Sequence, residues 1–132
     1  GRAYADSKLG CLVFACELQR RSDTHGWGVT SVGAHPGWSR TRIFGTGPLW
    51  QGSLVLGRLT RLAQSPADGA QPILLAATAT KTVGGSYFGP SRLQQVHGRP
   101  VQVPMPATAS DAATGHSLWR TLRELTDGAL PD

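Results

Sequence analysis

Apolar residues in the first part of the chain recur at helical spacing. The apolar positions are Leu9, Leu12, Val13 and Cys16. Polar and basic residues gather towards Arg21, where positive side chains interact favourably with the negative end of a helix dipole. Because residues three and four apart share one face of a helix, the pattern predicts a helix over Tyr4–Arg21.

A short uncharged segment follows this predicted helix. Val29–His35 is rich in β-branched residues at its start and stops at Pro36 and Gly37, which is typical of a buried parallel strand. A helix, a tight turn and a strand form half of an α/β repeat, so the order predicts an α/β fold. The glycine-rich stretch Trp38–Leu62 is expected to be a loop that leads into a short helix.

Capping residues predict a second helix. Ser65 can cap the first turn, Pro66 suits the first helical position, and Asp68 stands three residues after the cap. We expect this helix to run to about Ala79, with a kink at Pro72 because proline lacks the N–H that the helix needs.

The last third of the chain contains one predicted strand and one predicted helix. Ser86–Gly89 is a short strand that Pro90 should end. Leu93–Pro106 contains three prolines and no helical pattern, so it is expected to lie extended over the surface. Asp111 can cap a final helix. The apolar face of this helix is Leu118, Leu122 and Leu125, with Trp119 beside it.

Length and charge exclude some classes of protein. With 132 residues the chain suits about one domain, and no apolar run approaches the roughly 18 residues of a membrane span. The 13 basic residues exceed the 8 acidic ones by five, but they scatter instead of forming the stripe typical of nucleic-acid binding. We therefore expect no membrane span and no nucleic-acid partner; a basic nucleic-acid-binding module is the less favoured alternative.

The cysteines and histidines predict neither a disulfide nor a metal site. Cys11 and Cys16 lie in the apolar run of the first helix and are expected to be buried free thiols. Free thiols fit a reducing, cytoplasmic location. The four histidines lack the spacing of metal ligands.

Tyr4 and Lys8 have the clearest potential for chemistry. Four residues apart on a helix, they share one face with Cβ atoms about 5–6 Å apart. A positive charge about 6 Å from a phenolate stabilises it by about 3 kcal/mol at an effective dielectric constant of about 20. The pair can therefore act as an acid/base device, although the same spacing occurs in many chains as ordinary surface packing.

Several motifs follow this pair in a characteristic order. They are the rest of the helix Tyr4–Arg21, the strand ending in His35-Pro36-Gly37, Ser39-x-Thr41, Ser65-Pro66, Gly84–Pro90 and Leu118-Trp119. Together they resemble the C-terminal half of a short-chain dehydrogenase/reductase, most like the retinol-dehydrogenase-like branch. The resemblance covers essentially the whole chain.

The resemblance implies roles for the acid/base pair and for the turn. Tyr4 would be the proton donor or acceptor at the substrate carbonyl or alcohol. Lys8 would hydrogen-bond the nicotinamide ribose and stabilise the phenolate of Tyr4. Pro36 and Gly37 would form a turn that lets the backbone approach the nicotinamide closely.

The same resemblance implies cofactor contacts from two hydroxyls. Ser39 and Thr41 would face the amide or the phosphates of NAD or NADP, and either cofactor fits, because the family's selecting residue and glycine-rich phosphate loop lie upstream of the tyrosine. Residues 1–132 would then be a partial Rossmann-like domain, the C-terminal part of a doubly wound parallel sheet without its N-terminal cofactor-binding half.

The function implied for the parent protein is NAD(P)-dependent oxidoreduction. Hydride would pass between the nicotinamide and an alcohol or carbonyl substrate. The apolar, tryptophan-bearing loop Trp38–Leu62 points towards a lipophilic substrate. The family also implies a homodimer formed through the helix Tyr4–Arg21. The 132-residue fragment alone is expected to be inactive, and a truncated, non-catalytic remnant is the alternative.

Overall fold

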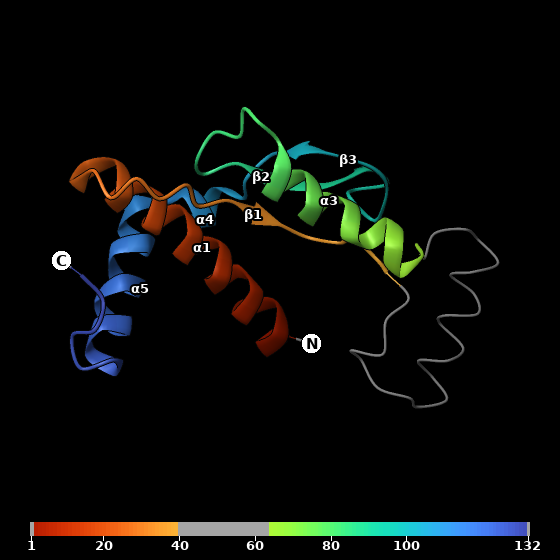
Figure 1. The fold of residues 1–132 in the computed structure, drawn as a ribbon. Coiled ribbons are helices and arrows are strands. Elements are labelled where there is room, and N and C mark those ends of the chain that lie inside the picture. The colour runs from red at the N-terminus through yellow and green to blue at the C-terminus, as the bar shows by residue number, and fades with distance from the viewer. Residues whose placement is uncertain (1, 40–63, 132) are drawn as a thin grey trace. The chain divides into compact units, whose positions relative to one another are not determined.

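The computed structural model describes residues 2–39 and 64–131, which Figure 1 draws as a coloured ribbon. The chain forms two compact units. The helical unit comprises Gly1–Gly33, Val83–Ser86 and Pro104–Asp132, and the sheet unit comprises Ala34–Thr82 and Tyr87–Val103. The loop and short helix predicted over Trp38–Leu62 lie almost wholly outside the described residues.

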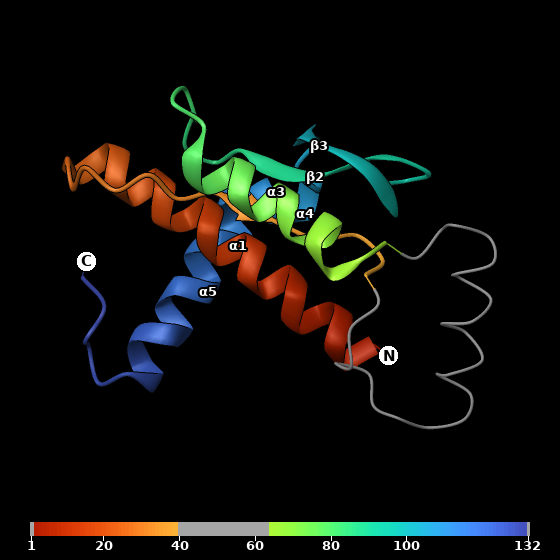
Figure 2. The same cartoon turned by 45° about the vertical axis from the view of Figure 1, so that its right-hand side comes forward.

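Helices dominate the helical unit. They are α1 (Arg2–His25), α4 (Ala107–Ser110) and α5 (Ala112–Leu125), and α1 packs against both of the others (Figure 2). The predicted N-terminal helix is confirmed, and it continues one turn beyond Arg21 until Gly26 adopts a left-handed conformation with φ +66°. Within the described ranges, no helix combines the length and apolar character needed to cross a membrane.

Trp119 is the centre of the contact between α1 and α5. Its side chain is 2% exposed, its ring stacks on Phe14 with centroids 5.5 Å apart, and its indole N–H donates to the carbonyl of Pro131 at 3.1 Å. The predicted apolar face of this helix is wrong in part, because Leu125 is 75% exposed. The buried stripe instead runs through Gly115 and Trp119, which are four residues apart on α5.

The two cysteines occupy different environments on α1. Cys16 is buried, and burial raises the pKa of its thiol, while the positive charge of Arg20 acts in the opposite direction. Cys11 is exposed, so the prediction that both thiols are buried is wrong for Cys11. Five residues turn through about 140° around a helix, and the two side chains therefore cannot share one buried face.

The described strands form a mixed sheet in the order β1-β2-β3. They are β1 (Gly33–Ala34), β2 (Tyr87–Arg92) and β3 (His97–Val103). The strands β2 and β3 are antiparallel, whereas β1 meets β2 in parallel through bonds from Gly33 N to Ser86 O and from His35 N to Phe88 O, each 2.9 Å. Helix α3 (Pro66–Thr78) packs along β2 and β3 (Figure 1). The predicted α/β class is confirmed.

The parallel strand predicted over Val29–His35 is shorter than expected, since only Gly33–Ala34 is strand. The residues before it find other hydrogen-bond partners. The N–H of Ser31 donates to Oε1 of Gln19 on α1 at 2.7 Å, and its carbonyl accepts from the N–H of Gly85 at 2.8 Å. These bonds satisfy backbone groups that would otherwise need a strand ladder.

The prediction that Leu93–Pro106 only lies extended over the surface is wrong in part, because half of it, His97–Val103, is the strand β3. This strand pairs along β2, and its last residue, Val103, is only 8% exposed. Pro90 does not end β2 but lies opposite Pro100, and the register shifts between Pro90 and Arg92. Prolines are tolerated in a sheet at such irregular positions, where fewer ladder N–H groups are needed.

The turn between β2 and β3 holds a strained backbone. Leu93, Gln94 and Gln95 have φ values of +46°, +51° and +67°. Left-handed backbone costs a residue other than glycine roughly 1–2 kcal/mol. Three such residues in succession persist only where surrounding contacts over-determine them.

Helix α3 begins as its sequence predicts. Ser65 is the N-cap, and its Oγ accepts from the N–H of Asp68 at 3.1 Å. The helix then continues through the fully buried Pro72 to Thr78, so the proline lies inside the helix and does not end it.

Candidate functional site

Helix α1 brings Tyr4 and Lys8 together, as the sequence predicts. Lys8 Nζ lies 5.5 Å from the centre of the Tyr4 ring. Both side chains are exposed, Tyr4 to 46%, and the hydroxyl of Ser7 donates to the Tyr4 carbonyl at 2.8 Å. A phenol and an ammonium therefore lie next to each other on an accessible face of α1, where they can exchange a proton with a bound molecule.

The sheet unit holds three other predicted site residues: Pro36, Gly37 and Ser39. Gly37 has φ +66°, and a Cβ built there would lie 2.7 Å from Cγ of Pro90 and strike the carbonyl oxygen of Val96. Glycine is therefore required at this turn on two grounds, its backbone conformation and the lack of space. Thr41 lies outside the described residues.

The carbonyl oxygen of Pro36 is held by two donors. The Oγ of Ser39 donates to it at 3.2 Å and the Nε2 of Gln64 at 2.8 Å. Ser39 is 8% exposed, and Gly69 of α3 packs directly against its side chain. The Ser39 hydroxyl is thus directed at the turn itself.

His35 joins this turn to the strained β2–β3 turn. Its Nδ1 accepts from the N–H of Gly37 at 3.2 Å, and its Nε2 lies 2.8 Å from Oε1 of Gln95. The ring also packs on Tyr87 at 5.1 Å between centroids, and burial raises the pKa of the Tyr87 phenol. The sequence singled out His35 only as the end of the strand before Pro36 and Gly37, and its histidines lacked metal-ligand spacing. Its position next to Pro36 and Gly37 is the one local signal of this role.

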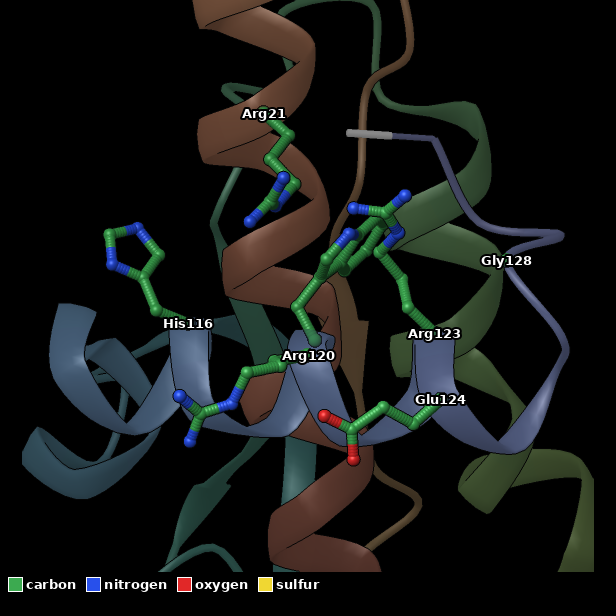
Figure 3. Close-up of a pocket in the computed structure, with 7 residues that line it drawn as sticks. Arg21, His116, Arg120, Arg123, Glu124 and Gly128 are labelled. Carbon is green, nitrogen blue, oxygen red and sulfur yellow. The ribbon is translucent and has the colours of Figure 1, made fainter.

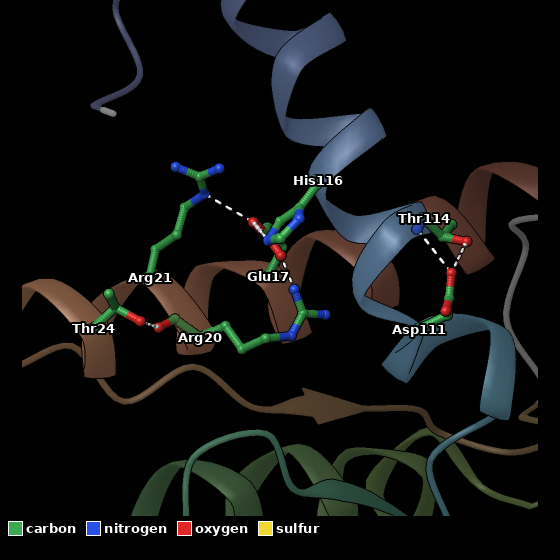
Figure 4. Close-up of polar contacts among 7 residues, drawn as sticks. All are labelled: Glu17, Arg20, Arg21, Thr24, Asp111, Thr114 and His116. Atoms are coloured by element: carbon green, nitrogen blue, oxygen red, sulfur yellow. Dashed lines mark hydrogen bonds and ion pairs between the residues drawn. The ribbon is translucent and has the colours of Figure 1, made fainter.

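Glu17 of α1 is a buried carboxylate that the sequence did not single out. Its side chain is 1% exposed and forms ion pairs with Arg20 and, at 2.8 Å, with Arg21 Nε, while His116 Nε2 of α5 lies 3.6 Å away (Figure 4). A Cβ at Gly115 would lie 2.7 Å from Glu17 Oε2. Both arginine partners lie on α1 itself, and Gly115 and His116 are the residues of α5 that pack against this carboxylate.

A basic pocket of about 340 Å³ lies in the helical unit (Figure 3). Its lining residues are Arg21, His116, Trp119, Arg120, Arg123, Glu124 and Gly128. The guanidinium of Arg21 lies 4.7 Å from the Trp119 ring centre and is also bound to Glu17. None of the described residues predicted for catalysis or cofactor binding lines this pocket.

Asp111 makes folding stability depend on pH. Its carboxylate accepts from the Thr114 hydroxyl at 2.6 Å and the Thr114 N–H at 2.8 Å (Figure 4), and these bonds lower the pKa of Asp111. A lowered folded-state pKa contributes stability above the unfolded-state pKa, and this contribution is lost as pH falls through the folded-state value. We expect Asp111→Asn to flatten the acid limb of unfolding free energy against pH.

The measurement is urea unfolding of the protein at a series of pH values between about 2 and 7. Thr114→Val is the matched variant, because it removes the hydroxyl donor and keeps the backbone donor. It should reduce the acid dependence only in part. An acid limb unchanged in both variants would contradict the assignment.

Comparison with known proteins finds relatives that match most of this chain. The chain is 32% identical over 127 residues to dehydrogenase/reductase SDR family member 13 of Bos taurus, covering 94% of this chain and 31% of that protein. It is 34% identical over 123 residues to retinol dehydrogenase 13 of Homo sapiens, covering 89% of this chain and 34% of that protein. No protein-family model matches the sequence.

A crystal structure has a similar fold. An uncharacterized protein from Mycobacterium paratuberculosis matches with a TM-score of 0.69 and 30% identity, over 98% of this chain and 40% of the other. The chain is thus homologous to short-chain dehydrogenases/reductases over about nine-tenths of its length. It spans about a third of the length of these two curated relatives.

Proposed function

We propose that the protein containing this chain is an NAD(P)-dependent oxidoreductase in which Tyr4 and Lys8 are the acid/base pair. The observation that carries the proposal is the 5.5 Å separation between Lys8 Nζ and the Tyr4 ring on the exposed face of α1. The homology to short-chain dehydrogenases/reductases supports it.

The chemistry of the pair follows from its two functional groups. In the reducing direction the Tyr4 hydroxyl gives its proton to the carbonyl oxygen of the substrate, and in the oxidising direction the phenolate takes the proton of the alcohol. The ammonium of Lys8 stabilises the phenolate by Coulomb attraction. Because Lys8 is exposed, its other N–H groups can donate to the ribose hydroxyls of a dinucleotide.

The nicotinamide cofactor supplies or accepts the hydride when it is bound. The exposed Pro36 and the tight turn at Gly37 fit a role in presenting backbone to its nicotinamide end. Ser39 fits a direct cofactor contact less well, since its hydroxyl donates to Pro36; we assign it to holding the turn. Thr41 stays a predicted contact, and NAD and NADP both fit the proposal.

The substrate class we propose is a lipophilic alcohol or its carbonyl counterpart. The support is the similarity to a relative named as a retinol dehydrogenase. The test uses the purified whole protein that contains this chain. Oxidation of NADH or NADPH with retinaldehyde is followed by absorbance and compared with a short polar aldehyde. Turnover should depend on one of the cofactors and should favour the lipophilic aldehyde.

Lys8→Met provides the residue-specific form of this test. We expect it to raise the KM for the cofactor and to lower kcat, because both the ribose donor and the charge beside Tyr4 are lost. Lys81→Met is the matched control, since Lys81 is the other lysine of the chain and is also exposed. Wild-type protein that neither binds nor oxidises NADH or NADPH would contradict the proposed function.

A further inference from the structure

The hydrogen bonds around His35 determine which of its ring nitrogens carries the proton. The backbone N–H of Gly37 can only donate, and it points at Nδ1 from 3.2 Å. Nδ1 must therefore be the unprotonated acceptor. The proton then lies on Nε2, which donates to Oε1 of Gln95 at 2.8 Å.

Gln95 reaches the ring of His35 from the strained turn between β2 and β3. Gln95 is the last of the three successive residues with positive φ in the β2–β3 turn. The residue after it, Val96, accepts at its carbonyl from the N–H of Trp38 at 2.8 Å and from Nε2 of Gln64 at 3.3 Å. The strained turn therefore bonds to the residues on both sides of Pro36–Gly37. Gln95 bonds to the ring of His35, and the carbonyl of Val96 accepts from the N–H of Trp38.

The ring of His35 has little freedom to leave this position. A Cβ at Gly89 of β2 would lie 2.7 Å from Cδ2 and 3.0 Å from Cε1 of the ring. Tyr87 of the same strand packs on the ring at 5.1 Å. The packing and the hydrogen bonds therefore both fix the orientation of the His35 ring.

We propose that His35, as the Nε2–H tautomer that the N–H of Gly37 selects and Gln95 accepts from, is a positioning residue that sets the conformation of the Pro36–Gly37 turn for the nicotinamide end of the cofactor. The inference rests on the proposed function. A protonated Nδ1 would present an N–H to the N–H of Gly37, so the turn keeps this bond only with the neutral tautomer described.

Two substitutions separate the acceptor of His35 from its ring. His35→Asn can place its amide oxygen where Nδ1 lies and so keeps the acceptor for Gly37 without the ring. His35→Phe keeps the ring against Tyr87 and Gly89 without any acceptor. If Nδ1 positions the turn, His35→Asn should bind NADH or NADPH within a few-fold of wild type, and His35→Phe should bind at least about tenfold more weakly.

The assay is fluorescence titration of the whole protein with NADH and with NADPH, alongside the KM for the cofactor and kcat. Gln95→Met, which keeps the length of the side chain without its amide, should weaken binding by a smaller factor. The reverse order, with His35→Phe close to wild type and His35→Asn impaired, would overturn the proposal and show that ring packing alone sets the turn. Equal affinity in all variants would overturn it as well.

A measurement on the wild-type protein needs no variant to fold. ¹⁵N-histidine NMR distinguishes a protonated from an unprotonated ring nitrogen, and it should show Nε2 protonated and Nδ1 bare at neutral pH. The opposite tautomer would overturn the role of His35 while leaving the proposed function intact. Absence of any binding of NADH or NADPH by the wild type would instead remove the proposed function, and this inference with it.

Discussion

Replacing Tyr4 by Phe in the whole enzyme is expected to reduce turnover by a factor of about 10² to 10⁴, the usual contribution of a positioned general acid or base. The ring of Phe can occupy the same space on α1, so only the hydroxyl is lost. The affinity for NADH and NADPH should stay close to that of the wild type. The loss should therefore lie in kcat rather than in the KM for the cofactor.

The chain offers a matched control for this substitution in its other tyrosine. Tyr87→Phe removes a phenol from a half-buried position in β2 and keeps the ring that packs on His35. It should leave turnover within a few-fold of wild type. Steady-state rates of both variants with the same aldehyde make the comparison, and retained turnover in Tyr4→Phe would remove Tyr4 from the chemistry.

Among the described glycines of the sheet unit, Gly37 should be the one whose replacement by alanine is most damaging. The new Cβ meets the carbonyl oxygen of Val96, a backbone atom that cannot rotate away, and lies 2.7 Å from Pro90 Cγ. The positive φ adds its own cost. The two effects together should lower the free energy of unfolding by roughly 2–5 kcal/mol and weaken NADH or NADPH binding.

Gly26→Ala separates the two contributions. Gly26 has the same φ of +66°, but a Cβ there meets nothing within 4 Å. It should lower the free energy of unfolding by only about 1–2 kcal/mol, the cost of the left-handed backbone. The measurement is urea unfolding of both variants, with cofactor titration as the second readout. Equal losses of stability in the two variants would contradict the steric argument.

The helices and the proximity of Tyr4 to Lys8 were predictable because the signals that define them are local. Tyr4 and Lys8 meet on α1 simply because a helix repeats every 3.6 residues. The N-caps Ser65 and Asp111 were recognised for the same reason, since each bonds to a backbone N–H three residues away. Local spacing does not show which face of a helix is covered by the rest of the protein. Leu125 and Cys11 are therefore exposed, although both lie in apolar patterns.

The sheet and the turn at Gly37 depended on residues far apart in the chain. Gln95 reaches His35 across 60 residues, and Gln64 reaches Pro36 across 28. Neither glutamine carries a local sequence signal, because an amide side chain occurs in solvent as readily as in a hydrogen bond inside the protein. The strand β3 was missed for a similar reason. Its Pro100 and the prolines that follow it argue against a strand until β2 is seen opposite with an irregular register.

The sequence by itself determined the α/β class, the helix that carries Tyr4 and Lys8, and the glycine at the turn after His35. These follow from periodicity and capping, which act within a few residues. Only the tertiary structure decided that Nδ1 of His35 accepts from the N–H of Gly37 and that the hydroxyl of Ser39 donates to the carbonyl of Pro36. It also decided that Glu17 is buried where α1 packs against α5. Such roles depend on which donor and acceptor remain when distant segments meet, and this pairing exists only in the folded chain.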